Sequence, residues 1–202
     1  MSAVLATVAL VLGIARLAMF VGLHLVRSDY NPVQHAVSDY AVGRTRRLSS
    51  AMTWTTGGMW ATLAVAVGLG FPAWSDRVGV IACLVALAVL FVALPFLPTD
   101  LEGREPTLIG RLHLLAAIAW FALSYACMGN FARLLTEPRA LGITLVALSW
   151  VALVSLTLLV VVLVLKPLRR RAFGVTERIF LVAVNLFYIT VSGGILLQPT
   201  TR

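Results

Sequence analysis

The sequence predicts an all-α protein, an integral membrane bundle of six transmembrane helices with a short interfacial helix in the first loop. Of its 202 residues, 60% are hydrophobic, and the mean hydropathy is +0.97, whereas roughly 45–50% is usual for a soluble domain. Six windows of about 20 mostly apolar residues are long enough to cross the hydrocarbon of a bilayer. None of them alternates apolar and polar residues, so helices are expected rather than the strands of a membrane barrel.

The six windows form one predicted domain over residues 1–202. They cover residues 4–25, 48–70, 78–97, 112–131, 141–165 and 179–197. All but the first contain no Lys, Arg, Asp or Glu. The first contains Arg16, and because a charge near the bilayer centre costs roughly 2.5–3.5 kcal/mol, this side chain is expected to face the bundle interior. Its expected partner is Asn185, Tyr188, a backbone carbonyl, water or the anionic head of a ligand, so a structural role and a ligand-binding role are both open.

Basic residues concentrate at one end of the predicted bundle. The first, third and fifth loops carry eleven Lys and Arg residues, whereas the opposite end carries Arg77, Arg133, Arg139 and Arg202. By the positive-inside rule the first group faces the cytoplasm. We therefore expect a multi-pass protein of the inner (plasma) membrane with both termini outside. Anionic lipid attracts each such residue by about 1 kcal/mol, so the net charge of +8 indicates membrane lipids as partners and no nucleic acid.

A polar segment, NPVQHAVSDYAVG at residues 31–43, precedes the second span. Asn31 suits a helix N-cap, a proline follows at the first helical position, and Gly43 suits the position after the C-cap. We therefore predict a short helix that lies along the membrane interface or folds back into the bundle. On this helix His35, Ser38 and Asp39 would share one face, because their spacing is i, i+3, i+4. They would either form part of a site or only pair locally, Asp39 with a nearby arginine.

The third loop supplies a matching polar cluster. Asp100 lies in a stretch that prolines and glycines break into turns, and His113 opens the next span. Polar residues then continue along three spans at helical spacing. The three stripes are Ser49, Thr53 and Thr56; His113, Trp120 and Ser124; and Asn185, Tyr188 and Ser192. Such residues join membrane helices by hydrogen bonds or line a cavity. Because the three stripes converge, we expect Asp39, Asp100 and His113 to be neighbours at one membrane face.

The order of three short motifs resembles the bacterial membrane-protein family catalogued as domain of unknown function 998. The motifs are SDYAVG at residues 38–43, FLPTD at residues 96–100 and GRLH at residues 110–113. The resemblance implies a six-helix membrane fold and marks Ser38, Asp39, Asp100 and His113, whereas His35 is outside the pattern. The family has no settled activity, so it implies no reaction. The sequence is more distantly similar to DRAM-type six-helix membrane proteins, which suggests a role related to lipids.

Binding without catalysis is the function that requires the fewest assumptions about these residues. The protein would bind a lipid-like ligand, or it would be an accessory subunit of a larger membrane complex. Arg16, His35, Asn185 and Tyr188 are the candidate ligand contacts. A small transporter is an alternative, and haem held by His24 and His113 is another. The sequence identifies no cofactor or metal.

The other main alternative is an enzyme that acts on a lipid or isoprenoid. Its candidate catalytic residues are Ser38, Asp39, Asp100 and His113. With His35 in place of Ser38, this set could hold a divalent metal that activates water. Without metal, His113 would be a general base oriented by Asp39, with Ser38 as a nucleophile. The sequence contains no HExxH or GxSxG motif, so neither mechanism has a specific signature.

Overall fold

The computed structural model describes residues 1–27, 30–100 and 105–198, and within these ranges all regular structure is helical. Six long helices are present there, one at each predicted window. Their bounds are α1 Ser2–Leu25, α2 Arg46–Gly70, α3 Arg77–Ala93, α4 Leu108–Leu134, α5 Arg139–Val164 and α6 Lys166–Leu197. The 3-10 helices η1 (Val37–Ala41) and η2 (Gly43–Thr45) precede α2, and η3 (Leu94–Phe96) extends α3.

Five of these helices are long and apolar enough to cross a membrane, which indicates a membrane protein. They are α1, α3 with η3, α4, α5 and the Arg171–Leu197 part of α6. α2 is not among them. It has 25 residues, but its serines, threonines and glycines make it less apolar than the others. Within the described residues, five of the six predicted spans therefore meet the requirements of length and apolarity.

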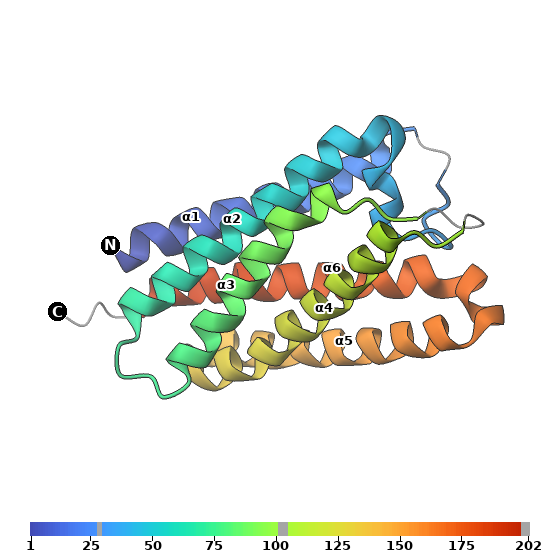
Figure 1. The fold of residues 1–202 in the computed structure, drawn as a ribbon. Helices are drawn as coiled ribbons and strands as arrows, with labels where there is room; N and C mark the ends of the chain where they lie inside the picture. The colour runs from blue at the N-terminus through green and yellow to red at the C-terminus, as the bar shows by residue number, and fades with distance from the viewer. Residues whose placement is uncertain (28–29, 101–104, 199–202) are drawn as a thin grey trace.

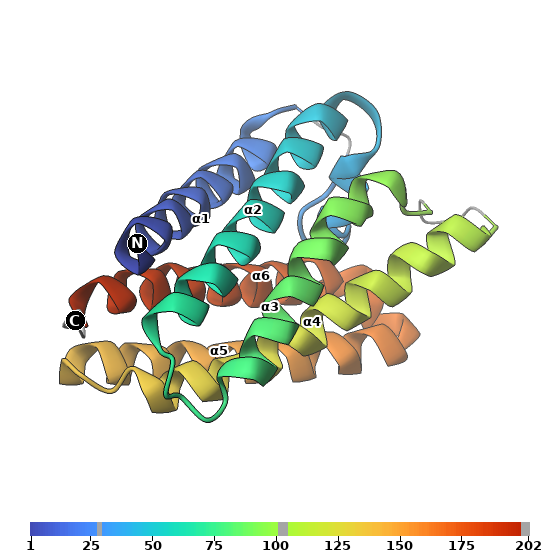
Figure 2. The ribbon, with the colours of Figure 1, turned by 60° about the vertical axis from the view of Figure 1, so that its left-hand side comes forward.

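The long helices lie side by side along one axis. The start of α1 and the end of α6 lie at one end of the bundle, and η1 and the start of α4 lie at the other (Figure 1). α2 packs against α1 and α3, while α6 packs against α1 and α5 (Figure 2). α6 is the central helix, because 61% of its apolar window is buried, compared with 28% or less in the other four candidate spans. α4 contacts α6 over a short stretch only.

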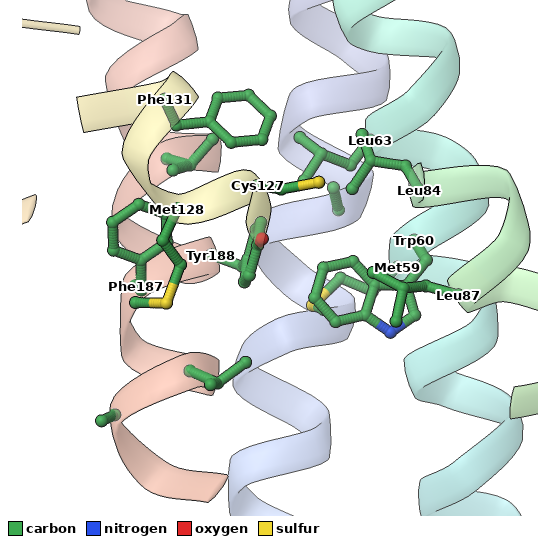
Figure 3. Close-up of a cluster of buried hydrophobic side chains, with 14 of the residues drawn as sticks. Met59, Trp60, Leu63, Leu84, Leu87, Cys127, Met128, Phe131, Phe187 and Tyr188 are labelled. Atoms are coloured by element: carbon green, nitrogen blue, oxygen red, sulfur yellow. The ribbon is translucent and has the colours of Figure 1, made fainter. Parts of the chain in front are cut away.

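The core is an aromatic and aliphatic cluster between α2, α3, α4 and α6 (Figure 3). The rings of Trp60 and Tyr188 meet edge to face with centroids 4.4 Å apart. Buried polar groups add bonds between helices: the Tyr188 hydroxyl donates to the Ser124 carbonyl over 2.7 Å, and Asn185 Nδ2 donates to the Gly13 carbonyl over 3.2 Å. A buried bond of this kind contributes about 1 kcal/mol. These two bonds join α6 to α4 and to α1.

The predicted fifth loop is wrong, because α6 begins at Lys166 rather than at residue 179. Pro167 lies in the first turn, which tolerates proline. The residues after it carry arginines and apolar side chains that suit an exposed helix. The prediction placed the helix start at the first long apolar window, but a helix can continue beyond the hydrocarbon when water or other protein surrounds its polar residues. Residues 166–178 are thus a helical extension of α6.

The predicted single helix over residues 31–43 is also wrong. Residues 32–34 form a turn, Ala36 is extended with ψ 154°, and only η1 and η2 are helical. Competition for backbone groups explains the difference: the Val33 carbonyl accepts a hydrogen bond from Gly174 N–H over 3.0 Å, and the His35 carbonyl accepts one from Arg178 over 2.8 Å. Both donors belong to α6, so these carbonyls are not available to a longer helix. Gly43 has the expected left-handed conformation, with φ 75°.

Candidate functional site

A cavity of about 350 Å³ lies between α4, α5 and α6, at the end of the bundle that holds the first and third loops. We call it the first cavity. The polar residues that line it are Gln34, His35, Ser38, Asp39, Thr99, Asp100, His113, Arg169 and Glu177. Its apolar lining continues inward along α4 and α5, from Leu114 to Ala122 and from Leu163 to Leu156. The cavity therefore has one polar end and one apolar end.

The structure brings together all four candidate catalytic residues. Ser38, Asp39, Asp100 and His113 line the first cavity, and so does His35. They come from η1, from the α3–α4 loop and from the first turns of α4, which meet at the same end of the bundle. Tyr188 and Asn185, predicted as ligand contacts, line neither this cavity nor its neighbour. Within the described residues they have the interhelical bonds given above, and Tyr188 is fully buried.

His113 has a defined orientation. Its Nδ1 lies 2.6 Å from the carbonyl oxygen of Leu97. A carbonyl oxygen only accepts, so Nδ1 carries the hydrogen and donates it. In the neutral ring, Nε2 is then an acceptor. Within the described residues no other group bonds to Nε2, which leaves this nitrogen available to a molecule in the cavity.

Asp100 serves the start of α4. Its two carboxylate oxygens accept hydrogen bonds from the backbone N–H and the hydroxyl of Thr107, each over 2.8 Å. The Thr107 hydroxyl oxygen in turn accepts from Gly110 N–H over 3.0 Å and so caps the helix. A side chain at Gly110 would collide with the Asp100 carboxylate. Asp100 of the FLPTD motif and Gly110 of the GRLH motif therefore lie against each other.

Two carboxylates hold η1 in place. Asp39 Oδ2 accepts a hydrogen bond from Ala36 N–H over 3.0 Å, and Glu177 Oε2 accepts one from Val37 N–H over 2.7 Å. Both side chains are buried. Sequence reasoning missed Glu177 because it placed this residue in a loop. The signal was present, since Glu177 lies eight residues before Asn185 and extends the polar stripe of the last span by two turns.

Arg178 joins three parts of the chain. Its Nε–H donates to Nε2 of His24 over 2.7 Å, and Nη1 donates to the carbonyls of His35 and Gly174 over 2.8 and 2.9 Å. Nδ1 of His24 lies 2.7 Å from the Phe20 carbonyl. Both ring nitrogens of His24 are therefore engaged, which leaves no lone pair for the haem iron that the sequence had suggested as an alternative.

The four residues His35, Asp39, Asp100 and His113 do not form a metal site. Within the described residues, no three side chains of His, Cys, Asp or Glu lie close enough together to hold one metal ion. Nδ1 of His35 accepts from the Asn31 N–H over 2.9 Å, and Asp100 is engaged by Thr107. His35, Asp39 and Asp100 therefore serve local turns or the start of α4, although all four side chains line the same cavity.

A second cavity of about 110 Å³ lies deeper, between α1, α2, α3, α4 and α6. It shares Ser38, His113 and Glu177 with the first cavity. Arg16 lines it, with 5% of its surface exposed. In the predicted polar stripes, the hydroxyls of Thr53, Thr56, Ser124 and Ser192 donate to carbonyls of their own helices, whereas Tyr188 and Asn185 donate to neighbouring helices. We call this space the second cavity.

The helical fold and the polar end of the first cavity define a membrane protein with an amphipathic internal cavity near one end. The family model described as protein of unknown function (DUF998) matches residues 3–193, nearly the whole chain. The chain therefore belongs to this family, as its motifs had indicated. No curated protein and no solved structure matches it.

Proposed function

We propose that the protein is a six-span membrane protein that binds one amphipathic, lipid-like molecule in the first cavity. The polar head of the ligand occupies the end lined by Ser38, Asp39 and His113. Its chain lies between α4 and α5. The observation that carries this proposal is the division of one cavity into a polar end and an apolar end.

The dimensions of the cavity suit this ligand. Its lining on α4 begins at Gly110 and ends at Ala122, which is about 18 Å along a helix at roughly 1.5 Å per residue. The polar residues lie in the first part of this length and the apolar residues in the rest. A lipid likewise has a polar head followed by an apolar chain. Drug-sized and cofactor-sized ligands bind in cavities of roughly 300–1,000 Å³, and the first cavity is within this range.

The route of entry supports a ligand that comes from the bilayer. Leu114, Ile118 and Val160 line the first cavity, yet each has about half of its surface exposed on the outside of the bundle. They belong to α4 and α5, both of which meet the requirements for a membrane span. The outer surface of these residues faces acyl chains. The cavity therefore opens sideways toward lipid between α4 and α5.

The position of α2 supports a sixth span. α2 connects α1 to α3 and packs along both of them. Its 25 residues extend about 37 Å at roughly 1.5 Å per residue, which exceeds the hydrocarbon thickness of about 30 Å. Thr53, Thr56 and Thr62 donate to carbonyls of their own helix, so these hydroxyls are tolerated in hydrocarbon. With six spans and the positive-inside rule, the polar end of the cavity is cytoplasmic and both termini are outside.

The test is to identify lipid retained by the purified protein with native mass spectrometry. Ala122→Trp should reduce the retained lipid, because Ala122 lines the first cavity. Ala126→Trp is the matched control, since Ala126 is an exposed alanine one turn away on the same helix and does not line the cavity. Equal retention by both variants would count against the proposal. Absence of lipid together with a fixed co-purifying protein would favour an accessory subunit.

A second candidate function is catalysis on the bound lipid, with His113 as a general base. The favouring observation is the Nδ1–H bond to Leu97, which fixes the ring and leaves Nε2 as the acceptor. Ser38 lines the same cavity. Chemical change of an added lipid by the wild type, lost in His113→Gln with lipid binding retained, would support this function.

A further inference from the structure

We infer that the ligand is an anionic amphiphile whose head reaches past Ser38 and His113 into the second cavity, where Arg16 binds its oxyanion group, a carboxylate or a phosphate. This inference rests on the proposed function, because the chain of the same ligand occupies the first cavity. It adds the chemical class of the head group and the residue that recognises it.

The first step is that Arg16 lacks a compensating charge. It lies inside α1, nine residues before the end of the helix, and is 95% buried. Within the described residues it forms no ion pair. In the part of the chain that the structure describes, its guanidinium forms one long hydrogen bond, from Nη1 to the Leu181 carbonyl over 3.4 Å, and lies 5.6 Å from the centre of the Phe20 ring. A buried guanidinium has five N–H donors, so most of its capacity is unused.

The second step is that other donors line the same cavity. Ser38 and Ser49 both line it. Within the described residues neither hydroxyl has a hydrogen-bond partner. Serine hydroxyls and arginine together are a common donor set for carboxylate and phosphate groups. The second cavity therefore offers a cation and two hydroxyls that the protein itself does not use.

The third step is size. The second cavity has about 110 Å³, and liquid water occupies about 30 Å³ per molecule. It is about a third of the size of the first cavity, so it suits a small oxyanion group better than an acyl chain. The first cavity, with which it shares Ser38, His113 and Glu177, has the apolar walls that a chain needs. The two cavities together therefore match a charged head and an apolar chain.

Glu177 is the acidic residue that lines both cavities, and it gives the inference a second test. It is not within ion-pair distance of Arg16, and its Oε2 accepts from Val37 N–H. A carboxylate there repels an anionic head that passes it. Glutamine keeps an oxygen acceptor for Val37, so Glu177→Gln should bind the anion at least as well as the wild type.

The experiment compares dioleoyl phosphatidic acid with dioleoylglycerol, which differ only in the phosphate, on the full chain in detergent by native mass spectrometry. The wild type should prefer the phosphatidic acid. In Arg16→Gln this preference should fall by about tenfold or more, as expected for loss of a charge-assisted interaction. Arg16→Lys should keep a part of it. Arg171→Gln removes an exposed basic residue of α6 that lines neither cavity, and it should leave the preference unchanged.

The outcomes separate the two proposals. If the wild type binds neither lipid, the proposed function fails. If both lipids bind and the preference is equal in the wild type and Arg16→Gln, the proposed function stands and Arg16 is only structural. Binding of dioleoylglycerol by Arg16→Gln at the wild-type level serves as the test that this variant is folded. Excess inorganic phosphate is the third arm: displacement of the phosphatidic acid would show that the free anion suffices and that the chain is not needed, which overturns an amphiphile as the ligand.

Discussion

Arg178 donates a hydrogen bond from Nε to Nε2 of His24 over 2.7 Å, and this bond joins α6 to the last turn of α1. The same guanidinium holds the His35 carbonyl, so one side chain fixes both α1 and the segment before η1 against the central helix. The polar end of the first cavity depends on this arrangement.

Arg178→Gln should lower the free energy of unfolding by about 2 kcal/mol or more, because it removes charge-assisted hydrogen bonds in a partly buried place. Arg133→Gln is the matched control. Arg133 forms an ion pair with Asp76 over 3.3 Å, but both side chains are exposed, and such pairs contribute about 0–1 kcal/mol. Thermal unfolding in one detergent measures both. A similar small shift for the two variants would contradict the role given to Arg178.

Gly174→Ala should destabilise the protein by about 1–3 kcal/mol, the usual cost of an overpacked contact. A Cβ at this position would collide with the Pro32 carbonyl and come within 2.6 Å of the His35 carbonyl, and neither backbone group can move without shifting the segment before η1. Gly193→Ala is the control in the same helix, since a Cβ there meets nothing within 4 Å. That change should be neutral or stabilising, because alanine favours helix over glycine. Chemical denaturation of the two variants distinguishes these results.

The losses of stability caused by Gly110→Ala and by Asp100→Ala should not be additive. The alanine at residue 110 collides with the Asp100 carboxylate, so Gly110→Ala alone should be destabilising, and Asp100→Ala alone should lose the Thr107 bonds at a cost of about 1–2 kcal/mol. In the double variant the collision is absent, so its total cost should be less than the sum of the two. A double-mutant cycle of thermal unfolding measures the coupling. Strict additivity would mean that Asp100 and Gly110 are not in contact.

Tyr188→Phe should cost about 1 kcal/mol of stability and leave lipid retention unchanged. The hydroxyl donates to the Ser124 carbonyl inside the core, and the loss of this buried hydrogen bond accounts for the cost. The residue does not line either cavity, so the substitution should not change the amount of lipid bound. Lipid quantification beside a melting curve tests both parts. A loss of lipid without a loss of stability would restore Tyr188 as a ligand contact.

The number and order of the long helices could be predicted from the sequence, because a long apolar window without alternation forms a helix in a bilayer. The positions of the helix ends could not be predicted in the same way. α6 starts thirteen residues before its apolar window, and no hydropathy pattern shows where a helix ends once it leaves the hydrocarbon. The residues before η1 could not be predicted for a different reason. Their conformation depends on donors from Gly174 and Arg178, which are more than 130 residues away in the chain.

The candidate site was predictable in place but not in detail. The pattern of polar residues located Ser38, Asp39, Asp100 and His113 at one end, and these four residues line one cavity. It did not show that Asp100 caps α4, since a carboxylate in a loop can cap, pair or bind metal with the same sequence. It also missed Glu177, which becomes part of the site only when α6 is continuous through residue 177.

The length of α6 has a mechanical consequence. Its 32 residues extend about 48 Å at roughly 1.5 Å per residue, well beyond a hydrocarbon layer of about 30 Å. Glu177 and Arg178 hold the polar wall above the ligand to the same rigid rod that forms the middle of the protein. If a thinner or thicker bilayer changes the tilt of this rod, that wall turns with it, while α4 and α5 on the other side follow their own tilt. On the proposed entry of lipid between α4 and α5, the rate of lipid uptake should therefore depend on the thickness of the surrounding membrane.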